Sequence, residues 1–181
     1  MNKAVLVAGG TGGHINAALA IGEALLVEGW DIQYLTGKRS LDYKLFQNRN
    51  VRHLNSRPLR TKNPILLLNN IILNLGSFLS ILKDFIIDRP KFILGAGGYV
   101  CGPSLLAGYI LGIPVFVIEQ NAVMGLTNRL LGWVARRIFV HFSKTHGLSK
   151  GLLKKVRVVG NPTRKTIQPV KARVFDGELR V

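Results

Sequence analysis

A glycine-rich run between an apolar strand and a helix is the feature that most limits what this chain can fold into. Residues 4–8 read AVLVA, which is typical of a buried strand, and residues 9–14 read GGTGGH. Apolar residues then recur at helical spacing to about residue 28, before Gly29. This order predicts the opening of a parallel α/β sheet. Its first turn can bind an anion, because exposed backbone N–H groups and a helix N-terminus favour negative charge.

The rest of the chain alternates β-rich runs with helical stretches. Strands are expected at residues 31–36, 51–54, 92–94, 115–118, 138–141 and 156–159, and helices at 40–48, 65–87, 103–111 and 126–135. Strands that alternate with helices through short loops favour an α/β fold with a Rossmann-like, doubly wound parallel sheet. Residues 165–181 contain no finished element, although Leu179-Arg180-Val181 reads like the start of a further strand.

The first glycine run matches neither of the two commonest nucleotide motifs. A dinucleotide fingerprint that starts at Gly10 requires Gly or Ala at position 15, where this chain has Ile15. The acidic residue expected after the second strand is also missing, since residues 36–39 read TGKR. No G-K-[ST] follows, which excludes a P-loop. We therefore expect a turn that binds an anionic sugar–phosphate group by another arrangement.

A second glycine-rich turn occupies residues 95–103, which read GAGGYVCGP after a predicted strand. Pro103 suits the first turn of a helix. Two such turns at the carboxyl ends of parallel strands would face the same crevice, where ligands of open α/β sheets bind. The pair suits a substrate that carries a pyrophosphate. The alternative is that one of the turns is only a tight structural connection.

Two sets of polar residues at these strand ends could take part in chemistry. His14 lies at the mouth of the first turn, where its imidazole could act as a general base on a hydroxyl or could simply cap the loop. Residues 119–121 read EQN directly after a predicted strand and could bond a sugar or an amide. By themselves these three residues are a weak signal.

The charge balance points to anionic partners. The chain has 25 Lys and Arg against 9 Asp and Glu, a formal net charge of +16. Such a surplus attracts nucleic acid, anionic lipid or phosphorylated substrates, or it reflects a Lys-rich proteome. The basic residues are spread out and accompany no nucleic-acid-binding motif, so membrane and pyrophosphate are favoured over nucleic acid. The one cysteine, Cys101, excludes an internal disulfide and a Cys-rich zinc site.

A long apolar helix is predicted at residues 65–87, after a basic loop at residues 56–64. The stretch from Ile65 to Leu82 holds no charge and is close to the length of a membrane span. Polar residues nevertheless recur near helical spacing and would be costly at the centre of a bilayer; they are Asn69, Asn70, Asn74, Ser77, Ser80 and Asp84. We expect a helix packed on the sheet whose apolar surface is available to a membrane interface. Plain core packing is the alternative.

Several segments, taken together, resemble the MurG family of bacterial cell-wall glycosyltransferases. They occur in the order of the family, from residue 3 to about 167: GGTGGH at 9–14, GGYVCGP at 97–103, LGIP at 111–114, EQNAV at 119–123, GLTNRL at 125–130 and VVGNPTR at 158–164. The chain departs from the family at Ala17, where proline is usual, and at Ile118, where histidine is common.

The resemblance implies the N-terminal domain of a two-domain GT-B glycosyltransferase. Residues 1–165 would form the acceptor-binding domain, residues 166–181 would begin the linker or a truncated second domain, and the C-terminal donor domain would be absent. The implied reaction transfers N-acetylglucosamine from UDP-N-acetylglucosamine to undecaprenyl-linked lipid I, with inversion, and gives lipid II for peptidoglycan synthesis. The implied location is peripheral, at the cytoplasmic face of the inner membrane, on an anionic surface.

The same resemblance assigns roles to individual residues. His14 and Glu119 fall at positions implicated in catalysis, and both are eligible as the general base. UDP-N-acetylglucosamine would contact Thr11, Gly12, Gly13, Asn121 and Arg164, and the acceptor pyrophosphate would contact Gly10, Gly97, Gly98 and Tyr99. No cofactor and no metal are expected. The chain alone is expected to be inactive.

Three other interpretations remain open from the sequence. The chain could be an acceptor subunit that needs a separate donor-domain chain, as in some eukaryotic transferases. It could be a non-catalytic module that binds lipid pyrophosphates, although Asn121 and Arg164, as donor contacts, argue against that. A nicotinamide-dependent oxidoreductase is the third and weakest interpretation, because the glycine motif does not fit.

Overall fold

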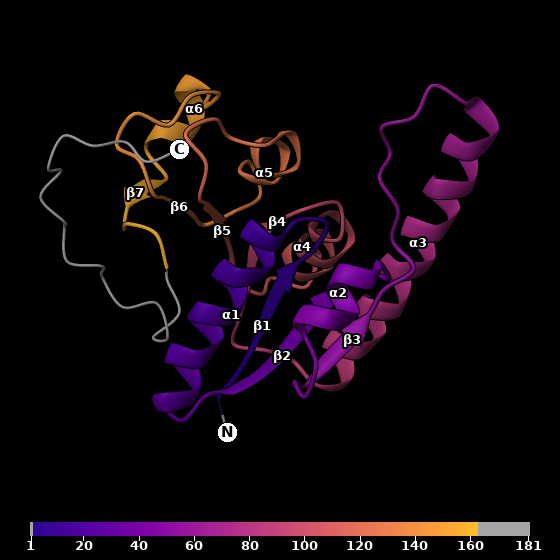
Figure 1. The fold of residues 1–181 in the computed structure, drawn as a ribbon, viewed down its shortest axis with the longest axis horizontal. Helices are drawn as coiled ribbons and strands as arrows, with labels where there is room; N and C mark the ends of the chain where they lie inside the picture. Colours follow the sequence, from indigo (N-terminus) through magenta and orange to yellow (C-terminus); the bar gives the residue numbers. More distant parts are fainter. Residues whose placement is uncertain (1, 163–181) are drawn as a thin grey trace, which may run out of the picture.

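The computed structural model describes residues 2–162 and contains one seven-stranded parallel sheet in the order β3-β2-β1-β4-β5-β6-β7 (Figure 1). Every neighbouring pair of strands is parallel. The strands are β1 (Lys3–Ala8), β2 (Asp31–Thr36), β3 (Val51–His53), β4 (Phe92–Gly97), β5 (Val115–Glu119), β6 (Arg137–Val140) and β7 (Val156–Val158). The order reverses between β1 and β4, so the expected Rossmann-like sheet is confirmed.

Helices cover both faces of the sheet. They are α1 (Gly12–Val27), α2 (Ser40–Leu45), α3 (Pro64–Ile87), α4 (Cys101–Ile110), α5 (Leu126–Leu131) and α6 (Lys150–Leu153). Helices α1 and α2 contact each other on one side, and α3, α4 and α5 form a contiguous row on the other. Because parallel crossovers are right-handed, helices before and after the reversal of strand order fall on opposite faces.

The alternation of side chains along β1 builds two separate cores. Ala4 and Leu6 point toward α1 and join one buried cluster, which includes Tyr34 and Phe46. Val5 and Val7 point to the opposite face and join the cluster that includes side chains of α3 and α4. All four of these β1 side chains are fully buried. Such a run reads as continuously hydrophobic because a central parallel strand is covered on both faces.

The glycine turns differ from their predicted boundaries. The first helix was expected to begin at His14, but α1 begins at Gly12, because Thr11 is its N-cap and the hydroxyl of Thr11 accepts a bond from the His14 amide at 3.5 Å. The last two glycines of the first run therefore form the first turn of the helix. The predicted helices at 40–48 and 126–135 end earlier, at Leu45 and Leu131, and α6 was not predicted.

Helix α3 leaves most of its apolar side chains exposed and turns its polar stripe to the protein. The Asn70 amide donates to the carbonyl of Pro58 at 2.8 Å, and the Asn74 amide donates to the carbonyl of Arg57 at 2.8 Å. Arg52 of β3 pairs with Asp84 and donates to Ser80. The stripe thus holds the basic loop and β3, whereas Ile65 and Leu68 are 80% and 60% exposed. Ile81 and Phe85, in the last turns of the helix, are buried in the core, so plain core packing describes only that part of α3.

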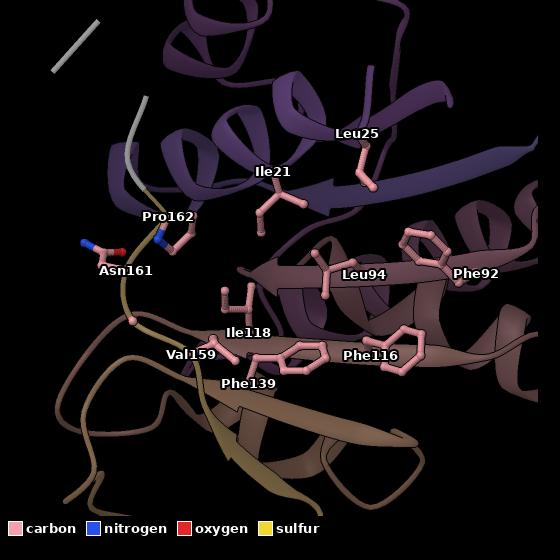
Figure 2. Close-up of a pocket in the computed structure, with 11 residues that line it drawn as sticks. Ile21, Leu25, Phe92, Leu94, Phe116, Ile118, Phe139, Val159, Asn161 and Pro162 are labelled. Atoms are coloured by element: carbon pink, nitrogen blue, oxygen red, sulfur yellow. The ribbon is translucent and has the colours of Figure 1, made fainter. Parts of the chain in front are cut away.

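An apolar hollow of about 440 Å³ lies on the α1 side of the sheet (Figure 2). Ile21 and Leu25 of α1 form one wall, and side chains of β4, β5 and β6 form the floor, with residues 159–162 at the rim. The floor carries Phe92, Phe116 and Phe139, and the ring of Phe116 contacts each of the other two. None of the glycine-turn residues 9–14 or 97–99 lines it, so the hollow is separate from the polar site described next.

Candidate active site

The two glycine turns interlock at the carboxyl edge of β1 and β4. The Gly9 amide donates to the carbonyl of Gly97 at 3.3 Å. A Cβ at Gly98 would overlap the carbonyl oxygen of Gly9, and Gly98 has φ +93°, so only glycine fits there without strain. The two turns therefore lie side by side at one edge of the sheet, as expected. Because Gly98 keeps the turns in contact, the second turn has a structural role whether or not it binds a ligand.

The N-terminus of α1 is open beside this contact. A Cβ built at Gly12 or Gly13 would meet nothing within 4 Å. The first turn of the helix carries no acidic residue. Backbone N–H groups at such a position are unpaired within the helix and carry the positive end of its dipole. The crevice therefore has room and donors for an anionic group.

His14 lies between the two turns. A Cβ at Gly97 would be 2.7 Å from the His14 ring at Cδ2 and Nε2, so the ring lies over that glycine at close range. Its Nδ1 atom is buried and has no hydrogen-bond partner in the part of the chain that the structure describes. The half-buried imidazole therefore packs against the second glycine turn.

A third segment, which the sequence did not single out, joins the site after β2. Asp42 is fully buried, and its carboxylate accepts bonds from the amides of Gly10 and Arg39 at 3.4 and 3.0 Å. Burial, followed by the charge of Asp42, raises the pKa of the Tyr99 phenol. An acidic residue three positions after a helix N-cap is a sequence signal that could have identified Asp42.

Glu119 is fully buried at the end of β5, and its carboxylate accepts four hydrogen bonds. Oε1 accepts from the backbone and side-chain amides of Asn121 at 3.1 and 2.8 Å. Oε2 accepts from the Gly125 amide at 2.9 Å and from the side chain of Asn128 at 3.0 Å. The acceptor sites of the carboxylate are therefore used by residues 121–128, and Glu119 holds the start of α5 against the end of β5.

The remaining predicted site residues lie around the same edge. Asn121 is exposed next to Glu119, and Gln120 links this loop to β4 through a bond to the carbonyl of Ala96 at 3.2 Å. Tyr99 lies against Gly10, whose Cβ position is 3.6 Å from the ring. Arg164 lies outside the described residues, as does the predicted boundary at 165–166. Among residues 2–162, no three His, Cys, Asp or Glu side chains are grouped so as to hold a metal ion.

The chain is similar in sequence to known glycosyltransferases. Residues 4–140 match the N-terminal domain of glycosyltransferase family 28. A Vibrio cholerae relative is 34% identical over 172 residues, which are 94% of this chain and 47% of the relative, and one from Tolumonas auensis is 38% identical over 165 residues, 88% of this chain and 44% of the relative. Both are named UDP-N-acetylglucosamine–N-acetylmuramyl-(pentapeptide) pyrophosphoryl-undecaprenol N-acetylglucosamine transferase.

The fold agrees with a solved relative. The crystal structure of Acinetobacter baumannii MurG superposes with a TM-score of 0.72 at 28% identity, over 91% of this chain and 47% of that one. The chain thus spans about half the length of the relatives it matches. The resemblance read from the sequence motifs is confirmed, and the chain belongs to glycosyltransferase family 28, of which it contains the N-terminal domain.

Proposed function

We propose that this chain is the acceptor-side half of the transferase that moves N-acetylglucosamine from UDP-N-acetylglucosamine to lipid I, which gives lipid II. The observation that carries the proposal is the crevice in which the open N-terminus of α1, the second glycine turn and His14 meet. A pyrophosphate-linked sugar needs this combination of anion-binding N–H groups and a nearby base. The donor and the acceptor are those in the names of the relatives.

The reaction divides among the residues as follows. Gly10, Gly97, Gly98 and Tyr99 hold the acceptor pyrophosphate, which places the attacking hydroxyl of N-acetylmuramic acid near His14. The hydroxyl oxygen attacks the anomeric carbon of N-acetylglucosamine, and the bond from that carbon to UDP breaks, with inversion. His14 accepts the hydroxyl proton, and UDP leaves. Glu119 keeps Asn121 in place rather than taking the proton, because its carboxylate is already saturated.

The donor is shared with a second domain. Thr11, Gly12, Gly13, Asn121 and Arg164 are this domain's contacts to UDP-N-acetylglucosamine, and residues 1–165 form the acceptor-binding domain. The other contacts come from a donor domain, either downstream in a longer polypeptide or in a separate chain. The chain alone is therefore inactive, because the closed cleft that excludes water is incomplete without that domain.

Helix α3 and the loop before it attach the domain to the cytoplasmic face of an anionic membrane. The helix is long and apolar enough to cross a bilayer by length and composition. However, its polar stripe bonds to the protein's own loop, so we propose that it lies in the interface with its exposed side in the lipid. Arg57, Arg60 and Lys62 add roughly 1 kcal/mol each near anionic lipid.

Vesicle co-sedimentation tests the membrane contact. Wild-type protein should bind vesicles that contain phosphatidylglycerol more strongly than vesicles of phosphatidylcholine alone. The double variant Ile72→Asn/Leu75→Asn should lose most of this binding. Leu153→Asn on α6 removes an equally exposed apolar side chain outside α3 and is the matched control. Equal binding by the two variants would contradict the assignment of α3 as the contact.

The activity is tested by transfer of labelled sugar from UDP-N-acetylglucosamine to a lipid I analogue. The chain is assayed alone and together with a donor domain expressed from a relative. We expect turnover in the mixture only, with His14→Ala reducing turnover more than Asn16→Ala, a neighbour on the exposed side of α1. Lipid I binding without turnover in the mixture would favour a non-catalytic lipid-pyrophosphate module. Loss of binding as well would refute the acceptor role.

A further inference from the structure

We propose that Arg39 is an additional ligand of the acceptor pyrophosphate, and that Asp42 and Tyr99 are the residues that position it. No sequence motif pointed to Arg39 or Asp42. The inference rests on the proposed function and deepens it, because it names the side chain that supplies positive charge to the glycine turns.

Arg39 reaches the first glycine turn from the end of β2. Its Nη1 donates to the carbonyl of Gly10 at 3.3 Å. Its guanidinium carbon lies 5.1 Å from the centre of the Tyr99 ring, which is within the range of a cation–π contact. One side chain therefore contacts the turns that follow both β1 and β4, at the edge where the acceptor is proposed to bind.

Asp42 fixes the backbone on both sides of this contact. Its Oδ2 accepts from the Arg39 amide at 3.0 Å, and its Oδ1 accepts from the Gly10 amide at 3.4 Å. The carboxylate is fully buried, so it is held by these amides and by the surrounding residues. Among residues 2–162 no salt bridge involves Arg39. The guanidinium thus keeps its charge and several N–H donors for a ligand.

The charge of the ligand explains why such a group is needed. A doubly esterified pyrophosphate carries two negative charges, whereas a helix N-terminus offers the equivalent of about half a positive charge. The only ionisable side chain in the first turn of α1 is His14, and the proposed mechanism requires it to be neutral before it accepts a proton. Arg39 supplies a permanent charge and a planar fork of donors that matches phosphate oxygens.

A purely structural role accounts poorly for this side chain. Arg39 is exposed, and its bond to the carbonyl of Gly10 is long. Exposed contacts of this kind contribute little to folding, so the removal of the guanidinium should leave the fold intact. Its placement over two glycine turns is instead what recognition of a phosphate group requires.

The experiment compares Arg39→Gln with Lys38→Gln, which removes an exposed positive charge one residue earlier in the chain. Binding of inorganic pyrophosphate to the whole chain is measured by calorimetry. Transfer is measured with the donor domain present. For Arg39→Gln we expect pyrophosphate affinity to fall and KM for the lipid I analogue to rise by roughly 10- to 100-fold, with KM for UDP-N-acetylglucosamine and Tm unchanged. Arg39→Lys should recover part of the loss.

The role of Asp42 is tested by asking whether the effects of the Arg39 and Asp42 variants on KM add. Asp42→Asn should raise KM for the lipid I analogue in the same direction, and the double variant Arg39→Gln/Asp42→Asn should be no worse than Arg39→Gln alone. Additive losses would refute the positioning role. If Asp42→Asn does not fold, the comparison of Arg39→Gln with Lys38→Gln still decides the role of Arg39.

Each outcome separates the inference from the function on which it rests. Equal losses in Arg39→Gln and Lys38→Gln would show a general effect of net charge and overturn the inference. A wild-type chain that binds pyrophosphate through Arg39 but transfers no sugar with any donor domain would refute the proposed function and retain the anion contact. Normal transfer by Arg39→Gln at low acceptor concentration would refute the inference alone.

Discussion

Two regions at the carboxyl edge of the sheet differ in whether their polar groups are hydrogen-bonded within the protein. In the glycine turns, the amides at the start of α1 have space around them, since a Cβ at Gly12 or Gly13 would touch nothing. In the loop after β5, Glu119 accepts four hydrogen bonds and ties together residues 119–128. The first region leaves backbone donors with space around them, whereas the polar groups of the second region bond to one another.

This difference helps to assign roles to residues that the sequence motifs make equally eligible as the general base. His14 and Glu119 are both eligible bases by sequence. However, a buried carboxylate whose oxygens already accept backbone and amide bonds loses part of that network when it takes a proton. The imidazole of His14 lies over the second glycine turn, and its buried Nδ1 has no hydrogen-bond partner among the described residues. The predictions below test the contrast between the closed and the open region.

The largest expected effect concerns the thiol beneath the second glycine turn. Burial raises the pKa of Cys101 to about 12, from 9.0. At pH 8 the thiolate population, and the rate of alkylation by iodoacetamide, should therefore be about 1,000-fold below those of an exposed cysteine. The denatured chain is the control. Fast labelling of the folded protein would show that the turn opens readily.

The same pKa shift has a consequence for stability at high pH. The unfolded chain releases the Cys101 proton above about pH 9, whereas the folded chain keeps it up to about pH 12. The folded state then binds more protons, so this group's contribution to stability is complete below pH 9 and is lost as pH rises through that window.

The second effect is a loss of folding stability in Gly98→Ala. The methyl group would overlap the carbonyl oxygen of Gly9, and φ of +93° is unfavourable for alanine. We expect a loss of about 3 kcal/mol in the free energy of unfolding, measured with urea. Gly102→Ala, four residues later in an uncrowded helix position, is the control and should not be destabilised. Similar midpoints for the two variants would show that the turns are not interlocked.

The third effect separates a positioning carboxylate from a catalytic one. Glu119→Ala leaves the Asn128 side chain and the Gly125 amide without their partner, and we expect a loss of about 2 kcal/mol. Glu119→Gln should also destabilise the loop, because its NH₂ group meets amides that donate. If Glu119→Gln instead kept full stability and lost turnover, Glu119 would be the base.

The smallest effect on folding is expected in the open region. Gly12→Ala places a methyl group in free space at the first position of α1, so the free energy of unfolding should change by less than about 1 kcal/mol. Binding of inorganic pyrophosphate and of UDP-N-acetylglucosamine should nevertheless weaken, because the methyl group occupies the ligand's approach. Unchanged binding of both would argue against the N-terminus of α1 as the anion site.

The amino-acid sequence by itself determined the order of the elements and the edge of the sheet at which the two glycine runs meet. The strand at residues 31–36 was predicted with its observed bounds. Alternating apolar residues between turn residues are typical of a strand. The glycine run before His14 and the run that contains Gly98 were expected at one edge, because parallel strands end on the same side. These features depend on residues that are close together in the chain, so they can be predicted from the sequence.

Only the tertiary structure decided which polar groups are free and which are occupied. Asp42 and Gly10 are 32 residues apart, and their contact depends on the pairing of β1 with β2. The inward turn of the polar stripe of α3 likewise depends on where the loop at Arg57 passes. A hydrogen bond between distant segments can occupy a polar group that, from the sequence alone, could have bound a ligand. The balance between open and closed regions is therefore set by packing, and the sequence pattern alone does not contain it.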